Sequence, residues 1–176
     1  MIAFLAACAP AVVLDDLGPL PPFSLTAQDG AVVSRDTFAG HVVVADFFFT
    51  TCPDVCPLLS AHMAEVATRY ATADDVRLVS ITVDPATDTP GVLATYGARY
   101  GAVPDRWYFL TGPVDTVKAV VVEGFKQAMV PSAAGGVLHG ERFVLVDKRG
   151  HLRGFPDPKE PGKKAIWAGV EALRRE

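Results

Sequence analysis

Two cysteines four residues apart are the residues of this chain best placed to do chemistry. They stand in the segment Thr51-Cys52-Pro53-Asp54-Val55-Cys56-Pro57, directly before a helical pattern. A spacing of four brings two side chains onto one face of a helix, and the helix dipole stabilises thiolate over thiol near the N-terminus. The pair could therefore close a disulfide, act as a redox dithiol, or hold a soft metal ion such as Cu(I) or Zn.

A third metal ligand would have to come from elsewhere in the chain, because two thiolates alone hold Cu(II) poorly and histidine is the usual addition. His139 closes a long loop immediately before a predicted strand, so it can stand at the same sheet edge as the cysteines. His41 opens a strand far from them, and His151 lies in a hairpin. His62 lies six residues after Cys56 on the same predicted helix, and six residues are about 600° of helical rotation, which turns it away from that cysteine.

Two carboxylates follow the next predicted strand. Asp84 ends that strand and Asp88 lies four residues later, in a loop that leaves the same carboxyl edge of the sheet. Open α/β sheets place their sites at this edge. A plain structural role is equally consistent with the pattern, because Asp88 or Thr89 can cap the helix that Pro90 begins.

The elements that must position these residues alternate along the chain. An apolar run at 41–49 is typical of a strand buried on both faces, and a helix is expected from about 57 to 71. We expect further strands at 76–84, 106–111, 141–147 and 151–154, helices at 89–100, 113–125 and 159–174, and a long loop at 126–140.

The alternation predicts parallel pairing in the centre of a sheet. Asp29-Gly30 predicts a hairpin near the N-terminus, and the last two strands predict an antiparallel edge. We therefore expect an α/β protein with a thioredoxin-like fold, in which a central mixed sheet carries helices on both faces and an N-terminal β-hairpin extension.

The composition restricts the functions to consider. The chain has 176 residues, half of them apolar, and a net charge of −4, which fits one domain with a sizeable core. No basic stripe with interleaved aromatic residues is present, so nucleic acid is not an expected partner. No apolar run reaches the length of a membrane-spanning helix.

The N-terminus resembles a lipoprotein signal. Leu5-Ala6-Ala7-Cys8 matches the pattern at which bacterial lipoprotein signals are cut and the new N-terminal cysteine is lipidated, although only seven residues precede Cys8 and none is Lys or Arg. The alternative is an apolar N-terminus with a spare cysteine. We expect residues 1–18 to be a signal-like segment and linker, and residues 19–176 to form the metal-binding domain.

Together these motifs resemble the Sco/SenC family. The resemblance rests on Cys52-Pro53-Asp54-Val55-Cys56-Pro57 after an aromatic strand, on Asp84 with Asp88, and on His139 before a late strand. Matching segments near both ends extend it over residues 19 to about 173: Phe23-Ser24-Leu25-Thr26 with Asp29-Gly30, and Val146-Asp147-Lys148-Arg149-Gly150.

The resemblance implies an exported protein, lipid-anchored at the periplasmic face of a bacterial membrane, that binds Cu(I), Cu(II) or both through Cys52, Cys56 and His139. It implies help in building the binuclear copper site of cytochrome c oxidase. The copper-site subunit is then the expected partner, beside other copper chaperones or thiol reductases. Asp84 and Asp88 match the family's acidic motif. Leu138 departs from the family, which usually has Asp there, where a carboxylate would help orient the imidazole.

Two enzymatic functions would use the same thiols. A thiol-disulfide oxidoreductase attacks a partner disulfide with one thiolate and resolves the mixed species with the other. Such reductases resemble Trp-Cys-x-x-Cys with a Pro opposite, whereas this chain has Thr51, three intervening residues and His139. Peroxiredoxins resemble Pro-x-x-x-Thr-x-x-Cys, and Ala45 and Phe49 stand at those positions. The pattern favours a metallochaperone over an enzyme, and it leaves reduction of a partner's cysteines open.

Overall fold

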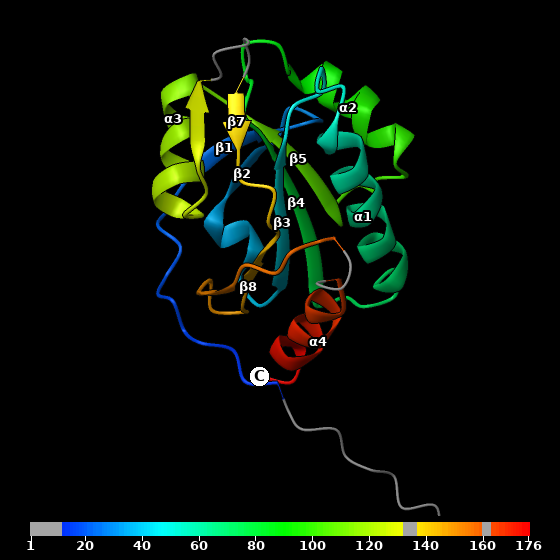
Figure 1. Ribbon diagram of the computed structural model, residues 1–176, viewed down its shortest axis with the longest axis vertical. Coiled ribbons are helices and arrows are strands. Elements are labelled where there is room, and N and C mark those ends of the chain that lie inside the picture. The colour runs from blue at the N-terminus through cyan, green and yellow to red at the C-terminus, as the bar shows by residue number, and fades with distance from the viewer. Residues whose placement is uncertain (1–11, 132–136, 160–162) are drawn as a thin grey trace, which may run out of the picture.

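The centre of the computed structural model, which describes residues 12–131, 137–159 and 163–176, is a seven-stranded mixed sheet (Figure 1). The strand order is β2-β1-β5-β4-β3-β8-β9. Three strands pair in parallel at its centre: β3 (Val42–Phe48), β4 (Val76–Thr82) and β5 (Trp107–Thr111). The flanking strands pair antiparallel: β1 (Ser24–Ala27), β2 (Val32–Ser34), β8 (Val144–Val146) and β9 (Leu152–Gly154).

Helices cover both faces of this sheet, as the sequence predicts. One face packs against α1 (Val55–Arg69), α2 (Pro90–Arg99) and α4 (Lys163–Arg174). The other packs against α3 (Val114–Ala119) and a π-helical turn (Val120–Gly124). Within the described ranges, no helix combines the length and the apolar character needed to cross a membrane.

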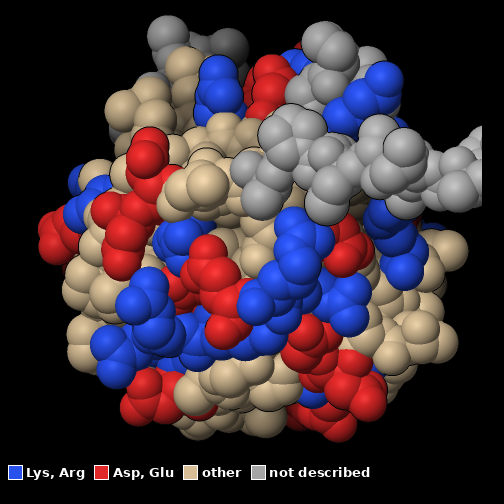
Figure 2. All heavy atoms as spheres, turned by 90° about the horizontal axis from the view of Figure 1, so that it is seen from below, with Lys and Arg blue, Asp and Glu red and all other residues tan. Residues whose placement is uncertain are grey.

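The two ends of the molecule differ in character. The N-terminal end of α1 and a small two-stranded sheet lie at the upper end of Figure 1, whereas the chain enters and ends at the lower end. Seen from below, acidic and basic side chains are interspersed around that lower end (Figure 2). Arg149 pairs with Asp16 and Asp147, and Arg174 pairs with Asp75.

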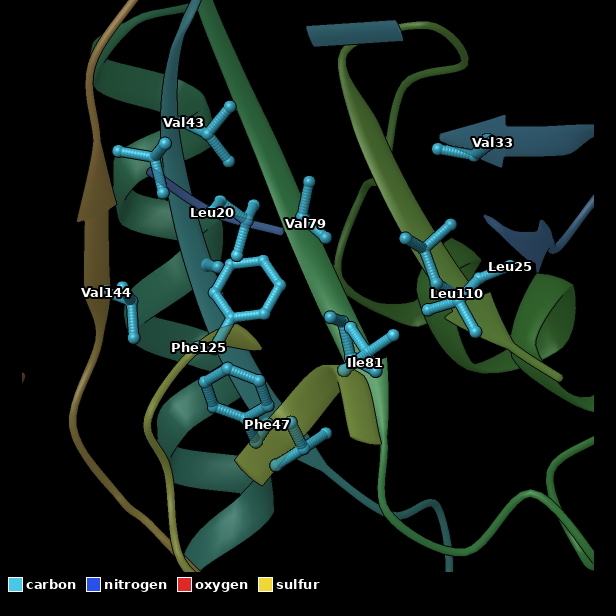
Figure 3. Packing of buried hydrophobic residues seen from close by; sticks show 14 of the residues in the cluster. Leu20, Leu25, Val33, Val43, Phe47, Val79, Ile81, Leu110, Phe125 and Val144 are labelled. Carbon is cyan, nitrogen blue, oxygen red and sulfur yellow. The ribbon is translucent and has the colours of Figure 1, made fainter. Parts of the chain in front are cut away.

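Each face of the sheet buries its own apolar cluster. Figure 3 shows the cluster beneath α3, where side chains of β3, β4 and β5 interdigitate and the Phe47 and Phe125 rings meet edge to face at 5.5 Å between centroids. All seven residues of β3 are buried, which is why its sequence is almost continuously apolar.

The segment at 126–140 is not the plain loop that the sequence predicts. It contains β6 (Met129–Pro131) and β7 (Val137–His139), which pair antiparallel with Met129 opposite His139. Three-residue strands leave too short an alternation to recognise. Because successive side chains of a strand point to opposite sides, Met129 and His139 share one face while Val130 and Leu138 are exposed on the other.

Other element boundaries also differ from expectation. Helix α1 starts at Val55, two residues early, so Cys56 lies within its first turn. The predicted helix at 113–125 is α3 followed by the π-helical turn, in which the Phe125 N–H donates to the Val120 carbonyl. The strand expected at 141–147 is shorter and comprises β8 alone, and Lys159, where the last helix is expected to begin, lies outside α4.

One carboxyl group is buried in the middle of β3. Asp46 is 1% exposed, and its Oδ1 accepts a 2.5 Å hydrogen bond from the Ser80 hydroxyl, which in turn accepts from Trp107 Nε1. Its Oδ2 has no hydrogen-bond partner within the described part of the chain. Burial raises the pKa of Asp46 to about 7, although the Ser80 hydrogen bond opposes the shift.

This carboxyl group should make stability depend on pH. Between about pH 4 and 7 the folded chain keeps a proton on Asp46 that the unfolded chain has lost, so the free energy of unfolding falls as pH rises. Between pH 5 and pH 8 the titration of Asp46 should lower the free energy of unfolding of the wild type by roughly 3 kcal/mol, at about 1.4 kcal/mol per pKa unit. Asp46→Asn should abolish this fall. Urea unfolding of both proteins at the two pH values measures it; the exposed Asp36→Asn is the control. Equal pH dependence in wild type and Asp46→Asn would contradict the assignment.

Candidate metal centre

The two predicted cysteines lie at the carboxyl end of β3. Cys52 is half-buried in the loop that follows the strand, and Cys56, in the first turn of α1, has no exposed surface. Both are free thiols. Within this loop the Cys52 N–H donates to the carbonyl of Phe49, the first residue after the strand, at 3.3 Å.

The surroundings give the two thiols opposite acidities. Burial alone would raise the pKa of Cys52, but hydrogen bonds from the Cys56 thiol and from the backbone N–H groups of Cys56, Asp54 and Val55 outweigh it and lower that pKa. Burial and the neighbouring Cys52 together raise the pKa of Cys56. Cys52 is therefore the partly exposed, thiolate-prone member of the pair, and Cys56 is the shielded one.

His139 reaches the pair from β7, 83 residues further along the chain. Its Nε2 lies 3.5 Å from the Cys56 sulfur. Its Nδ1 lies 2.9 Å from the Gly140 carbonyl, which can only accept, so Nδ1 carries a proton. Burial lowers the pKa of His139, although Gly140 and Glu141 oppose this. The imidazole is thus neutral near pH 7, with the lone pair of Nε2 directed at the sulfur.

Two contacts orient this imidazole without a carboxylate. The Gly140 carbonyl fixes the tautomer, and the Phe49 ring meets the imidazole edge to face at 5.9 Å between centroids. Leu138, which stands where Asp is usual in the family resemblance, is 59% exposed and points away from the site. A backbone acceptor therefore does here what a carboxylate would do.

Asp88 supports the site from the loop that follows β4. It has no exposed surface and accepts hydrogen bonds from the Thr50 N–H at 3.1 Å, the Thr50 hydroxyl, and the Thr82 hydroxyl at 2.5 Å. These bonds tie the loop before Cys52 to the end of β4. Asp88 does not cap α2, because the Thr89 hydroxyl accepts from the Val92 N–H instead.

Asp84 has a backbone role in the same loop. Its carbonyl accepts from the N–H groups of Thr87 and Asp88, and its own N–H donates to the Thr82 hydroxyl at 3.0 Å. Of the remaining candidates, His41 bonds the Ala39 carbonyl and His151 bonds Asp16, both away from the thiols. Cys8 lies outside the described residues.

The three predicted ligands are neighbours but do not yet form a closed cage. Cys56 contacts both Cys52 and His139, whereas in the described ranges no three His, Cys, Asp or Glu side chains converge as a ready metal site. Cys52 is the member in a partly exposed loop. Binding one ion by all three would therefore require Cys52 to turn toward His139.

Sequence reasoning missed three residues that build this site. Thr50 and Thr82 meet only through Asp88, and Phe49 packs on an imidazole 90 positions away in the chain. No spacing rule connects them. Asp46 could have been noticed, because it is the one acidic residue in the apolar run 41–49.

We expect the hydrogen bonds that Asp88 accepts from Thr50 and Thr82 to stabilise the site. Asp88→Ala leaves two hydroxyls and one backbone N–H without their buried acceptor and should lower the free energy of unfolding by about 2–4 kcal/mol. Asp84→Ala is the matched control and should cost about 1 kcal/mol or less, since only backbone atoms of that residue bond the loop. Chemical denaturation measures both. Equal effects of the two substitutions would contradict this stabilising role of the Asp88 side chain.

The unequal thiols should react at unequal rates. In a Cys8→Ser chain at pH 7, iodoacetamide should modify Cys52 at least about tenfold faster than Cys56, because only Cys52 is accessible and thiolate-prone. Mass spectrometry of peptides after timed quenching gives both rates. Faster labelling of Cys56 would reverse the assignment.

Comparison with known proteins identifies the family. The SCO1/SenC family matches residues 18–174. The chain is 35% identical over 153 residues to the SCO1 protein homolog of Bacillus subtilis, covering 85% of this chain and 79% of that protein. It is 33% identical over 141 residues to a putative copper-binding protein of Stutzerimonas stutzeri, covering 77% of this chain and 67% of that protein.

Solved structures share the fold. A SCO1/SenC family lipoprotein from Bacillus anthracis superposes with a TM-score of 0.82 at 29% identity, covering 90% of this chain and 96% of that one. BsSco, a member of the Sco family of cytochrome c oxidase assembly proteins with a described disulfide switch, gives 0.80 at 32%, covering 93% and 98%. Copper-bound ScoI of Bradyrhizobium japonicum gives 0.72 at 27%, covering 90% and 99%. The chain has the thioredoxin-like fold expected from its sequence, and it belongs to the SCO1/SenC family.

Proposed function

We propose that this chain is a copper metallochaperone that binds copper through Cys52, Cys56 and His139. The contact of 3.5 Å between the Cys56 sulfur and His139 Nε2 carries the proposal, because it brings a soft thiol and a neutral imidazole together from segments 83 residues apart. Two thiolates suit Cu(I), and an added imidazole suits Cu(II).

The relatives support copper as the cargo. The Bradyrhizobium japonicum ScoI structure contains copper, and the Stutzerimonas stutzeri relative is described as a putative copper-binding protein. Cys52, Cys56 and His139 are the copper ligands that we propose, and the contact between Cys56 and His139 supports them. Cys52 is the accessible ligand and so the one through which an incoming or outgoing ion would exchange first.

We further propose delivery to the binuclear copper site of cytochrome c oxidase, with the copper-site subunit as partner. BsSco belongs to a family of cytochrome c oxidase assembly proteins, which supports this recipient. Other copper chaperones or thiol reductases would supply the ion or reduce the thiols. A lipid anchor at Cys8, at the periplasmic face of a bacterial membrane, is supported by the lipoprotein from Bacillus anthracis.

A thiol-disulfide oxidoreductase is the second candidate, and one observation favours it. A partly exposed thiol with a lowered pKa beside a shielded thiol is the arrangement in which the first attacks and the second resolves. A Cys52–Cys56 disulfide is the oxidised product that this function requires, and BsSco is described as having a disulfide switch.

Copper titration of the reduced Cys8→Ser chain tests the first candidate. We expect one saturable copper per chain and a sulfur-to-Cu(II) charge-transfer band. Cys52→Ala or Cys56→Ala should abolish tight binding. His139→Ala should weaken Cu(II) by about 100-fold or more and Cu(I) less, because even orienting contacts to a metal ligand are worth 10–100-fold.

His151→Ala is the matched control, since that histidine bonds Asp16 away from the thiols and its loss should leave both affinities unchanged. Unchanged Cu(II) binding in His139→Ala would remove this residue from the site. Absence of copper binding, together with fast reduction of a disulfide peptide by the wild-type chain, would favour the oxidoreductase.

A further inference from the structure

The first described residues are attached to the body as an added strand. The strap, residues 14–20, runs along the open edge of β9: the Leu17 N–H donates to the Leu152 carbonyl at 2.9 Å and the Leu152 N–H donates to the Gly18 carbonyl at 2.9 Å. The Leu20 N–H donates to the Gly150 carbonyl at 2.8 Å. This segment falls mostly within residues that the sequence assigns to a linker.

A buried arginine fixes the start of the strap. Arg153, which is 7% exposed, donates from Nε to the Asp15 carbonyl at 3.0 Å and from its guanidinium to the Leu14 carbonyl at 2.9 Å. The same guanidinium pairs with Asp147 and with Glu176 near the C-terminus. One side chain thus joins the strap, the β8–β9 turn and the end of α4.

The side chain of Asp16 adds a second attachment. It lies 2.9 Å from His151 Nδ1 and 3.3 Å from the Arg149 guanidinium. Leu14 packs partly buried against the apolar cluster beneath α1 and α4. The strap is therefore held by backbone, ionic and apolar contacts together.

The strap and the metal centre lie at opposite ends of the sheet (Figure 1). The Gly40 N–H donates to the Lys148 carbonyl, which places the β8–β9 turn beside the amino end of β3. Cys52 follows the carboxyl end of the same strand. The seven residues of β3 separate the two ends by about 23 Å.

The sequence leaves a short tether between this strap and the proposed lipid anchor. Six residue steps join Cys8 to Leu14, and even a fully extended chain of that length reaches only about 20 Å. A body of this size is about 40 Å across. A lipid at Cys8 therefore allows the body to tilt, but not to invert.

We propose that the strap face, formed by residues 14–20, the 147–151 turn and the C-terminal residues 174–176, is held against the membrane, with the Cys52, Cys56 and His139 centre turned away from it. This inference rests on the lipid anchor at Cys8 in the proposed function. The face carries both signs of charge, largely paired with one another, so the tether rather than a basic patch supplies the attachment (Figure 2). A recipient must then present its copper site outside the membrane plane.

Energy transfer to a lipid dye tests the orientation. A chain with Cys52→Ser and Cys56→Ser is coupled through Cys8 to maleimide lipids in phosphatidylcholine–phosphatidylglycerol vesicles that carry an acceptor dye. A donor is attached through an azido amino acid at exposed Asp36, near the strap face, or at exposed Val130, beside the metal centre. We expect transfer from position 130 to be roughly half or less of that from position 36, given the length of β3.

Two changes should allow the body to reorient on the membrane, and neither alters the metal centre. Arg153→Ala should free the strap and raise transfer from position 130, whereas Arg142→Ala, which loses one exposed bond to the Phe155 carbonyl, should not. Because Arg153→Ala can also destabilise the fold, a flexible Gly/Ser insertion between Pro10 and Ala11 provides a second test. It should bring the two transfer efficiencies together.

Equal transfer from positions 36 and 130, in the chain that lacks both Arg153→Ala and the Gly/Ser insertion, would overturn the proposal. The chemical coupling makes this result independent of whether cells lipidate Cys8. Mass spectrometry of the chain extracted from bacterial membranes tests lipidation separately. The two failures are therefore distinguishable.

Discussion

The burial of β3 on both faces is the constraint on which the rest of the structure depends. Every residue of the strand is shielded, so helices must cover both sides and the chain can turn only after Phe48. That turn delivers Cys52 and Cys56 to the start of α1, while the parallel neighbour β4 delivers the Asp88 loop to the same edge. The site lies where it does because parallel strands release their following loops at one end of a sheet.

Reasoning from the sequence reached the parts of the site that depend on local pattern. The thiol pair after an apolar strand, the helix that begins at Pro90, and the hairpin at Asp29-Gly30 are all found where the pattern predicts them. The approach of His139 was predicted from its place before a late strand, and the contact with Cys56 agrees with it.

What the sequence did not reveal depends on contacts between distant segments. The β6–β7 pair is too short to leave a periodic signal, yet it determines which side of the ribbon His139 occupies. The hydrogen bonds from Thr50 and Thr82 to Asp88 come from residues that look like ordinary loop and strand positions. The strap looks like a linker in the sequence because its attachments are backbone bonds, which any sequence can make, and side-chain bonds to residues more than 130 positions away, such as Arg153.

The same geometry serves both chemistries proposed for the thiols, and the difference between them lies in which neighbour Cys56 engages. Facing His139 Nε2, Cys56 belongs to a mixed sulfur and nitrogen donor set, which suits copper. Facing Cys52, it belongs to a dithiol whose two members differ in acidity, which suits exchange with a disulfide. Cys52 is the residue that would have to turn between the two arrangements, since Cys56 lies within the first turn of α1 and His139 is held by the Gly140 carbonyl. Copper occupying both sulfurs would therefore block disulfide formation, and a Cys52–Cys56 disulfide would remove both thiolates from copper. At the proposed site, metal loading and thiol oxidation would therefore exclude one another.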